Sequence, residues 1–167
     1  MDKSRSDFNT FSINDYSDLC SVLTPERIGI LDCNDKENAL RCVSDLLATA
    51  PDVTNAEELT EGIFYREQLM STGIGLGIAV PHVRLESVQN PAMAVGISRE
   101  GIHDYESLDN APVHLIFMIA AGKDQHKQYL RLLSAVSARL KDDGIRQALM
   151  NADDGKHFHD ILFAEAD

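Results

Sequence analysis

The sequence predicts an α/β fold: a single domain in which helices flank a mixed β-sheet. Its 167 residues, 44% of them hydrophobic, suit one domain with one core. Residues 112–121 are almost continuously apolar, which is typical of a central strand buried on both faces. An amphipathic helical stripe follows, formed by Tyr129, Leu133, Val136 and Leu140. Strands that alternate with helices indicate an α/β domain, and short hairpin-like segments leave room for antiparallel pairs.

The predicted helices share a polar cap followed by apolar residues at helical spacing. Asn34 with Glu37 caps a predicted helix over 35–50, and Thr54 with Glu57 caps a second one that bears Leu59, Ile63 and Met70. Asp124 is the predicted cap of the long helix, which ends ahead of Gly144. Asp153 or Asp154 caps a last helix that bears Phe158, Ile161 and Leu162. The polar residues 1–18 predict a flexible N-terminal segment, and the folded domain is expected to cover 19–165.

Residues 71–82, STGIGLGIAVPH, carry three glycines at alternate positions, which predicts a closely packed backbone rather than a helix. Residues 78–80 form a short predicted strand, and Pro81 ends it because proline cannot donate a ladder hydrogen bond. His82 therefore follows at a strand end, where a rigid scaffold meets a loop. Residues 91–97 predict a further strand.

The composition limits the classes of partner. The formal net charge is −12 and the pI is about 4.8, without a Lys/Arg-rich run, so a nucleic-acid partner is not predicted. The acidic surface either steers a basic protein partner or only aids solubility. No apolar stretch approaches the ~20 residues that a membrane-spanning helix needs, so membrane insertion is not predicted. Cys20, Cys33 and Cys42 match neither a CxxC pair nor a zinc-finger pattern, which predicts reduced thiols and a cytoplasmic location.

His82 is the strongest candidate for chemistry. A neutral imidazole is a good nucleophile that titrates near neutral pH, and it can form a covalent phosphoenzyme intermediate. Glycine-rich backbone beside it can expose N–H groups that hold an anion. The alternative, from the residues alone, is that His82 is an ordinary surface or hydrogen-bonding histidine.

Nucleotide and metal sites are not predicted. The GIGLG run lacks the GxGxxG spacing, GxxxxGK[ST] is absent, and the run precedes a strand rather than a helix. No HExxH motif is present, and the other histidines are scattered: His103, His114, His126, His157 and His159. The sequence therefore predicts no metal and no cofactor.

The segment REQLMSTGIGLGIAVPH, residues 66–82, resembles the signature of the enzyme IIA family of the bacterial phosphotransferase system, of the fructose, mannitol and nitrogen-regulatory type. Among the members of that family, the chain most resembles the stand-alone nitrogen-type proteins. Further segments with the same resemblance are SVLTPERI near 21–28, LDNAPVHLIFMIAAGKDQ at 108–125, and YLRLLSAVSARLKDDGIRQAL at 129–149. A long motif that is supported by several other segments makes chance similarity improbable.

The resemblance implies that His82 accepts a phosphoryl group from a phosphohistidine carrier protein of the HPr or NPr kind. It also implies that Arg66, which opens the motif, lies near that group. One position departs from the family: the usual second active-site histidine is replaced by Tyr129. His126, three residues earlier, either substitutes for it or is merely solvent-exposed.

Further support for the phosphoryl group is expected from Arg84, Thr72 and Gly73.

Three functions follow from the resemblance and stay open. The first is a regulatory phosphoprotein whose charge on His82 switches its binding to target proteins. The second is a sugar-transport component that passes the phosphoryl group to a cysteine of an enzyme IIB. The third is a phosphate-independent binding module, which Tyr129 favours. The sequence predicts neither the oligomeric state nor the ring nitrogen that is modified.

Overall fold

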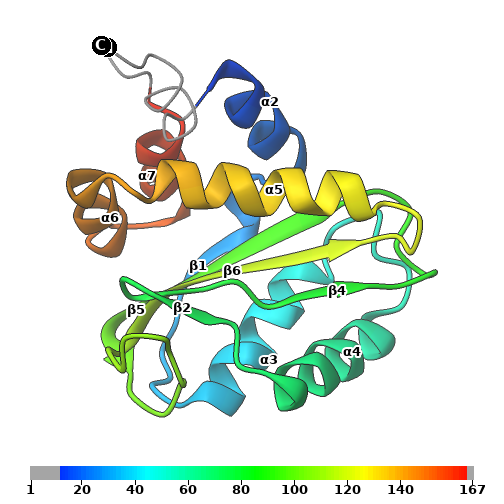
Figure 1. The fold of residues 1–167 in the computed structure, drawn as a ribbon, viewed down its shortest axis with the longest axis horizontal. Coiled ribbons are helices and arrows are strands. Elements are labelled where there is room, and N and C mark those ends of the chain that lie inside the picture. The colour runs from blue at the N-terminus through cyan, green and yellow to red at the C-terminus, as the bar shows by residue number, and fades with distance from the viewer. Residues whose placement is uncertain (1–11, 165–167) are drawn as a thin grey trace.

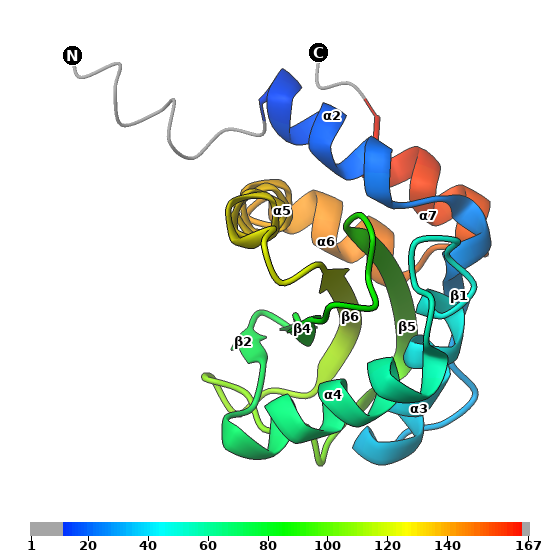
Figure 2. The same ribbon diagram turned by 90° about the vertical axis from the view of Figure 1, so that its right-hand side faces the viewer.

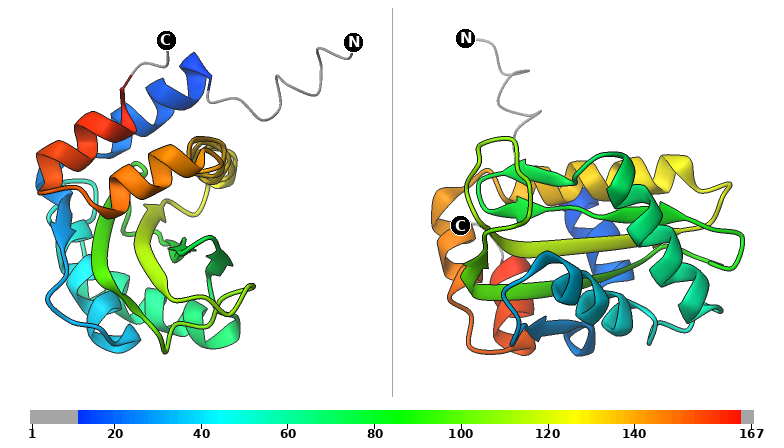
Figure 3. Two further views of the ribbon diagram at one scale, coloured as in Figure 1. Left: turned by 90° about the vertical axis from the view of Figure 1, so that its left-hand side faces the viewer. Right: turned by 90° about the horizontal axis from the view of Figure 1, so that it is seen from below.

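The computed structural model of the protein describes residues 12–164, and it has a mixed sheet between two layers of helices (Figures 1 and 3). The strands are β1 (Ile28–Ile30), β2 (Gly73–Gly75), β3 (Ile78–Ala79), β4 (His82–Arg84), β5 (Ala92–Ile102) and β6 (Val113–Ala121). The helices are α2 (Ile13–Val22), α3 (Lys36–Leu47), α4 (Ala56–Leu69), α5 (His126–Arg139), α6 (Asp143–Met150) and α7 (Gly155–Leu162), with a 3-10 turn η1 (Pro25–Arg27). The predicted fold class is confirmed. No helix in this part of the chain is long and apolar enough to cross a membrane.

Strand β6 is the centre of the sheet. The strand order is β1-β5-β6-β3-β2, and β4 also pairs with β6. Strand β5 runs antiparallel to β6, whereas β3 and β4 run parallel to it. All of β6 is buried except the half-buried His114, so the prediction of a central strand at 112–121 is confirmed. The predicted strands at 78–80 and 91–97 correspond to β3 and to the first half of β5.

Helices cover both faces of the sheet. In Figure 1, α2, α5, α6 and α7 lie on one side, and α3 and α4 lie on the other. Successive side chains of a strand point to opposite faces, so β6 supplies both cores. Phe117 and Ile119 pack with the helices of the first side, and Ile116 and Met118 pack with those of the second. Full burial of side chains of this size contributes about 1.5–3 kcal/mol each.

Two helix starts lie one residue later than the caps that the sequence predicts. The N-cap of α3 is Asp35, not Asn34, and its carboxylate accepts the third helical N–H at 3.0 Å. The N-cap of α4 is Asn55, not Thr54, and its side chain also accepts at 3.0 Å. At both sites two neighbouring residues can cap a helix, and the choice depends on which side-chain oxygen reaches the N3 amide.

The C-terminal helices differ more from the prediction. The long helix α5 begins after Gln125, not Asp124, and it has no side-chain cap because the Gln125 oxygen accepts from Gly122. Gly144 does not stand beyond a helix end. It lies inside α6, a helix that the sequence did not predict and that Asp142 caps. Helix α7 begins after Asp154, one of the two predicted starts.

Helix α2 takes in residues 13–18, for which the sequence predicts a flexible segment. Ser12 and Asp15 form a reciprocal capping box, and Leu19 and Val22 anchor the helix in the core. Residues 1–11 of that prediction lie outside the described residues, and the domain boundary stays a prediction.

Candidate functional site

The glycine-rich segment forms a tight turn between short strands. Residues 75–77 all have left-handed backbones, with φ of 95° at Gly75, 60° at Leu76 and 79° at Gly77. Glycine adopts this conformation without steric cost. At Gly73 a side chain would strike the backbone of Glu106, so only glycine fits between the two segments. The prediction of a closely packed backbone is thereby explained.

Three N–H groups of this segment have acceptors within the protein. The amides of Thr72, Gly73 and Leu76 donate to Glu67, Ser71 and Asp109 respectively. The amides of Thr72 and Gly73 are thus engaged within the protein, and their support for a phosphoryl group stays a prediction.

His82 is the first residue of β4, where it pairs with Ile119 of β6. Its half-buried ring places Nδ1 at 2.9 Å from the carbonyl oxygen of Val80. A carbonyl oxygen only accepts hydrogen bonds, so Nδ1 carries the proton and Nε2 keeps the lone pair. The structure thus selects one tautomer, which the sequence left open.

Burial is the main cause that lowers the pKa of His82 below its usual value. The hydrogen bond to Val80 and the charge of Glu67 raise this pKa, whereas the charges of Arg66 and Arg84 lower it. The net shift is downward, so the imidazole is neutral at pH 7. A neutral ring is the form that acts as a nucleophile.

Close packing of α4 on β4 brings Arg66 towards His82. A Cβ on Gly62 would lie 2.9 Å from Val83 Cγ2, so glycine permits this approach. Arg66 follows Gly62 by four residues and therefore lies on the same helical face. Its Nη1 donates to the Met70 carbonyl at 3.0 Å, which closes the end of α4.

Arg84 lies two residues beyond His82, so their side chains leave the same face of β4. It is exposed, and its Nη1 is 3.5 Å from the carbonyl oxygen of Lys123. Figure 2 shows β4 between β2 and β6, with α5 above it and α4 below. The half-buried His82 and the exposed Arg84 therefore lie on the surface between these two helices.

Tyr129 packs directly on the candidate nucleophile. The ring centroids of His82 and Tyr129 are 4.8 Å apart, with an interplanar angle of 40°. Tyr129 is also a buried core residue. Burial raises the pKa of its hydroxyl, against the charges of Arg66 and Arg84, so it stays protonated at neutral pH. His126 is exposed, and its ring centroid lies 6.0 Å from that of Tyr129.

Sequence reasoning missed a buried polar network behind the turn. Glu67 is only 7% exposed and binds Thr72 and Lys36, while Tyr105 bonds to the hydroxyl of Thr72. The signal was present: Glu67 stands four residues after Ile63, on the apolar stripe of the helix. Charged side chains are rarely buried there without partners. Thr72 therefore lies in this network and not on the open surface.

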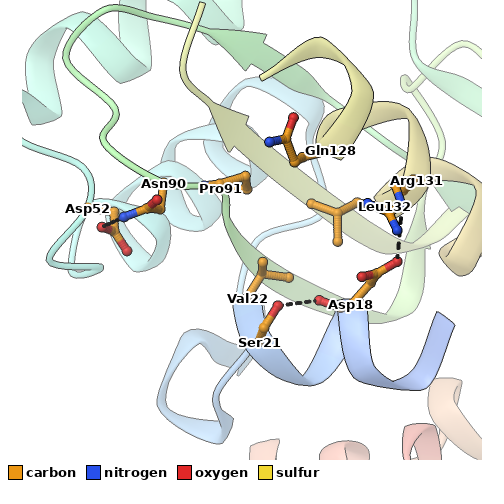
Figure 4. Close-up of a pocket in the computed structure, with 9 residues that line it drawn as sticks. All are labelled: Asp18, Ser21, Val22, Asp52, Asn90, Pro91, Gln128, Arg131 and Leu132. Atoms are coloured by element: carbon orange, nitrogen blue, oxygen red, sulfur yellow. Dashed lines mark hydrogen bonds and ion pairs between the residues drawn. The ribbon is translucent and has the colours of Figure 1, made fainter. Parts of the chain in front are cut away.

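A separate cavity lies between α2 and α5 (Figure 4). Its volume is about 410 Å³, and the Asp18–Arg131 ion pair at 3.9 Å crosses its wall. None of the candidate site residues lines it.

Among the described residues, no three His, Cys, Asp or Glu side chains are placed to hold a metal ion.

The family model for "Phosphoenolpyruvate-dependent sugar phosphotransferase system, EIIA 2" matches residues 21–165. The chain belongs to this enzyme IIA family. The resemblance of residues 66–82 to the family signature is thus confirmed.

Enzyme IIA relatives of two kinds match the chain. The "PTS system fructose-specific EIIABC component" of Bacillus subtilis is 39% identical over 86% of this chain, and the match spans 23% of that relative. The "Nitrogen regulatory protein" of Escherichia coli is 35% identical over 78% of this chain and 79% of its own length. A crystal structure of nitrogen regulatory protein IIA-Ntr from Neisseria meningitidis has a TM-score of 0.77 at 26% identity, covering 85% of this chain and 97% of that one.

Proposed function

We propose that this enzyme IIA accepts a phosphoryl group on Nε2 of His82 from a phosphohistidine carrier protein of the HPr or NPr kind. The hydrogen bond from Nδ1 to Val80 carries the proposal, because it leaves the Nε2 lone pair available for attack. The lowered pKa of His82 supports it, since the ring is neutral and nucleophilic at pH 7.

The transfer needs positioning and charge neutralisation more than covalent assistance. Nε2 of His82 attacks the phosphorus in line, and a new N–P bond forms. The bond between phosphorus and the carrier imidazole breaks, and the leaving nitrogen keeps its electron pair. Nδ1 of His82 retains its proton throughout and continues to donate to Val80. No metal or nucleotide is required by this scheme.

Two arginines supply positive charge to the proposed site. Both Arg66 and Arg84 are close enough to lower the pKa of His82 and of Tyr129. A guanidinium fits phosphate oxygens in a planar fork, and it stays charged at any working pH. We assign Arg66 the main stabilising role, because β4 and α4 are tightly packed, and Arg84 a supporting one.

Tyr129 replaces the second histidine in this scheme. Its protonated hydroxyl can donate one hydrogen bond to a phosphoryl oxygen, but it brings no positive charge. The two arginines therefore carry the electrostatic stabilisation. His126, which neighbours Tyr129 from the exposed side, is a secondary donor at most.

Exposed apolar side chains near the site favour a protein partner over a small substrate. Met70, whose carbonyl holds Arg66, is 70% exposed, and Leu130, next to Tyr129, is 46% exposed. Ile74 on β2 is also exposed. Clusters of apolar and arginine side chains are typical of surfaces that bind proteins.

We favour regulation as the outcome of phosphorylation. The nitrogen regulatory protein of E. coli is 35% identical to this chain, and the IIA-Ntr structure from Neisseria meningitidis has a TM-score of 0.77, against 0.70 for the mannitol IIA of Escherichia coli. A near-dianion on His82 would repel acidic partners and attract arginines, which changes partner choice. A cytoplasmic location, where the carrier proteins act, belongs to the same proposal.

Sugar transport is the second candidate, because the fructose component is 39% identical to this chain. In that function the phosphoryl group passes from His82 to a cysteine of an enzyme IIB. A binding module that never accepts phosphate is the third, and only the replacement at Tyr129 favours it.

The first test is phosphorylation of the purified protein by phosphoenolpyruvate, enzyme I and carrier, read by intact mass. We expect a phosphate-sized, acid-labile gain that His82→Ala abolishes. A gain that persists in His82→Ala would refute the assignment, and no gain with an active cognate donor would favour the binding module. Stable transfer onward to an enzyme IIB cysteine would replace regulation by transport.

A further inference from the structure

We propose that Glu67 is a positioning residue for His82, acting through a hydrogen-bonded relay that passes through Thr72 and Val80. The relay rests on the proposed function only for its effect on rate, since its effect on the histidine ring exists without phosphate. Glu67 touches neither the nucleophile nor the expected phosphoryl group.

The first link fixes Thr72 from two sides. Glu67 Oε1 accepts the Thr72 amide at 2.9 Å, and Oε2 accepts the Thr72 hydroxyl at 2.8 Å. Both residues are buried, at 7% and 5% exposure, so water does not compete for these bonds. Hydrogen bonds to a carboxylate are about twice as strong as neutral ones.

The second and third links run through the backbone to the imidazole. The carbonyl oxygen of Thr72 accepts the N–H of Val80 at 3.0 Å. The carbonyl oxygen of Val80 accepts Nδ1–H of His82 at 2.9 Å. The N–H and the carbonyl of Thr72 belong to adjacent peptide units, and so do those of Val80, so the relay acts through position: a shift of the Thr72 backbone moves Val80, and with it the carbonyl oxygen that holds the ring.

Two further side chains hold the buried end of the relay. Lys36 Nζ lies 3.2 Å from Glu67 Oε1 and 4.5 Å from the ring centre of Tyr105. The Tyr105 hydroxyl is 2.7 Å from that of Thr72. The Thr72 hydroxyl has one proton, which it donates in the hydrogen bond to the Glu67 carboxylate. The Tyr105 hydroxyl must therefore be the donor in its bond to Thr72. Burial raises the pKa of Tyr105, which keeps the proton that this bond requires.

Glu67 also follows Arg66 directly on α4. Its carboxylate holds Thr72, two residues beyond the Met70 carbonyl that Arg66 contacts, so it stabilises both the segment after the helix end and the relay to the nucleophile. A loss of its acceptor capacity would misplace two groups at once. Displacement of catalytic groups by about 1 Å costs up to about 100-fold in rate.

A purely structural buried ion pair is the competing explanation. It predicts that changes at Glu67 alter stability and leave the His82 ring as it is. The tautomer of His82 separates the two, and it is measured by ¹⁵N NMR of the ring nitrogens in the unphosphorylated protein.

The variants are Glu67→Gln and Thr72→Val. A glutamine cannot accept both bonds from Thr72 and also face Lys36, and valine removes the hydroxyl without a change in net charge. Glu61→Gln, exposed on the same helix, controls for the lost charge, and Thr72→Ser restores the hydroxyl. We expect both relay variants to lower the fraction of Nδ1–H tautomer, Glu67→Gln more than Thr72→Val.

The rate of phosphoryl acceptance should fall about 10- to 100-fold in Glu67→Gln. It should fall less in Thr72→Val and return in Thr72→Ser, while Glu61→Gln matches the wild type. Folded relay variants with an unchanged tautomer would overturn the relay, whatever their stability. Should Glu67→Gln fail to fold, Thr72→Val and Tyr105→Phe decide by the same tautomer criterion. If the wild type takes no phosphate, the proposed function fails while the NMR result still judges the relay.

Discussion

Substitution of Gly62 by alanine is the sharpest test of how the structure places Arg66. In an exposed helix, glycine to alanine stabilises by about 1 kcal/mol. At Gly62 the new methyl carbon would lie 2.9 Å from Val83 Cγ2, whereas carbon atoms in contact are about 3.5–4.0 Å apart. Helix α4 and strand β4 must therefore separate by roughly 0.6 Å or more, or Val83 must leave its rotamer.

The two effects oppose each other, and we expect the clash to win. Extra methylenes in packed regions cost about 1–3 kcal/mol, so the net loss centres on about 1 kcal/mol. For a domain of this size that is a fall in Tm of about 2–4 °C. Because Arg66 lies one turn further along the same face, phosphoryl acceptance by His82 should fall more than stability does.

Thermal unfolding and the phosphorylation assay measure the two effects separately. Gly144→Ala is the matched control: it changes the same residue type in α6, where only the Asp142 side chain approaches, and it should stabilise by about 0.5–1 kcal/mol. Val83→Ala should remove the clash, so Gly62→Ala should cost less in that background. A rise in Tm for Gly62→Ala with normal phosphorylation would refute the packing argument.

Three further predictions concern titration and helix ends. Because the pKa of His82 is lowered in the folded state, the unfolded state binds a proton more readily. The free energy of unfolding and the rate of phosphoryl acceptance should therefore be constant above about pH 6.5 and decline as the pH falls below it. A rate that drops above that pH would contradict this. Buried Arg139 donates to the carbonyl of Leu162 at 2.8 Å, at the C-terminal end of α7. Arg139→Met should therefore lower the free energy of unfolding by about 2 kcal/mol or more in denaturant titrations. An unchanged midpoint would show that Arg139 does not stabilise the end of α7. Asp154→Ala removes the N-cap bond to the His157 amide and should cost about 1 kcal/mol in the same assay, whereas Asp154→Asn should recover most of it.

The sequence by itself was sufficient for the fold class and the candidate nucleophile. Apolar periodicity reports which faces are buried, so the central strand at 112–121 and most helices were predicted from local pattern. The resemblance of residues 66–82 to the family signature singled out His82 and Arg66. Helix ends were less certain, since Asn34 and Asp35 are equally good caps and only the geometry of the amide chooses.

Tertiary structure decided everything that depends on contacts between distant segments. The Nδ1 tautomer of His82 follows from the position of a backbone oxygen, which no side-chain pattern encodes. The sequence left open whether Tyr129 is a core residue or a site residue, and the fold buries it with its ring against that of His82. Glu67 is a buried carboxylate whose partners, Lys36 and Thr72, come from other segments of the chain. The energy of a buried polar group depends on partners that only the folded chain brings within reach, so its role could not be read from sequence order alone.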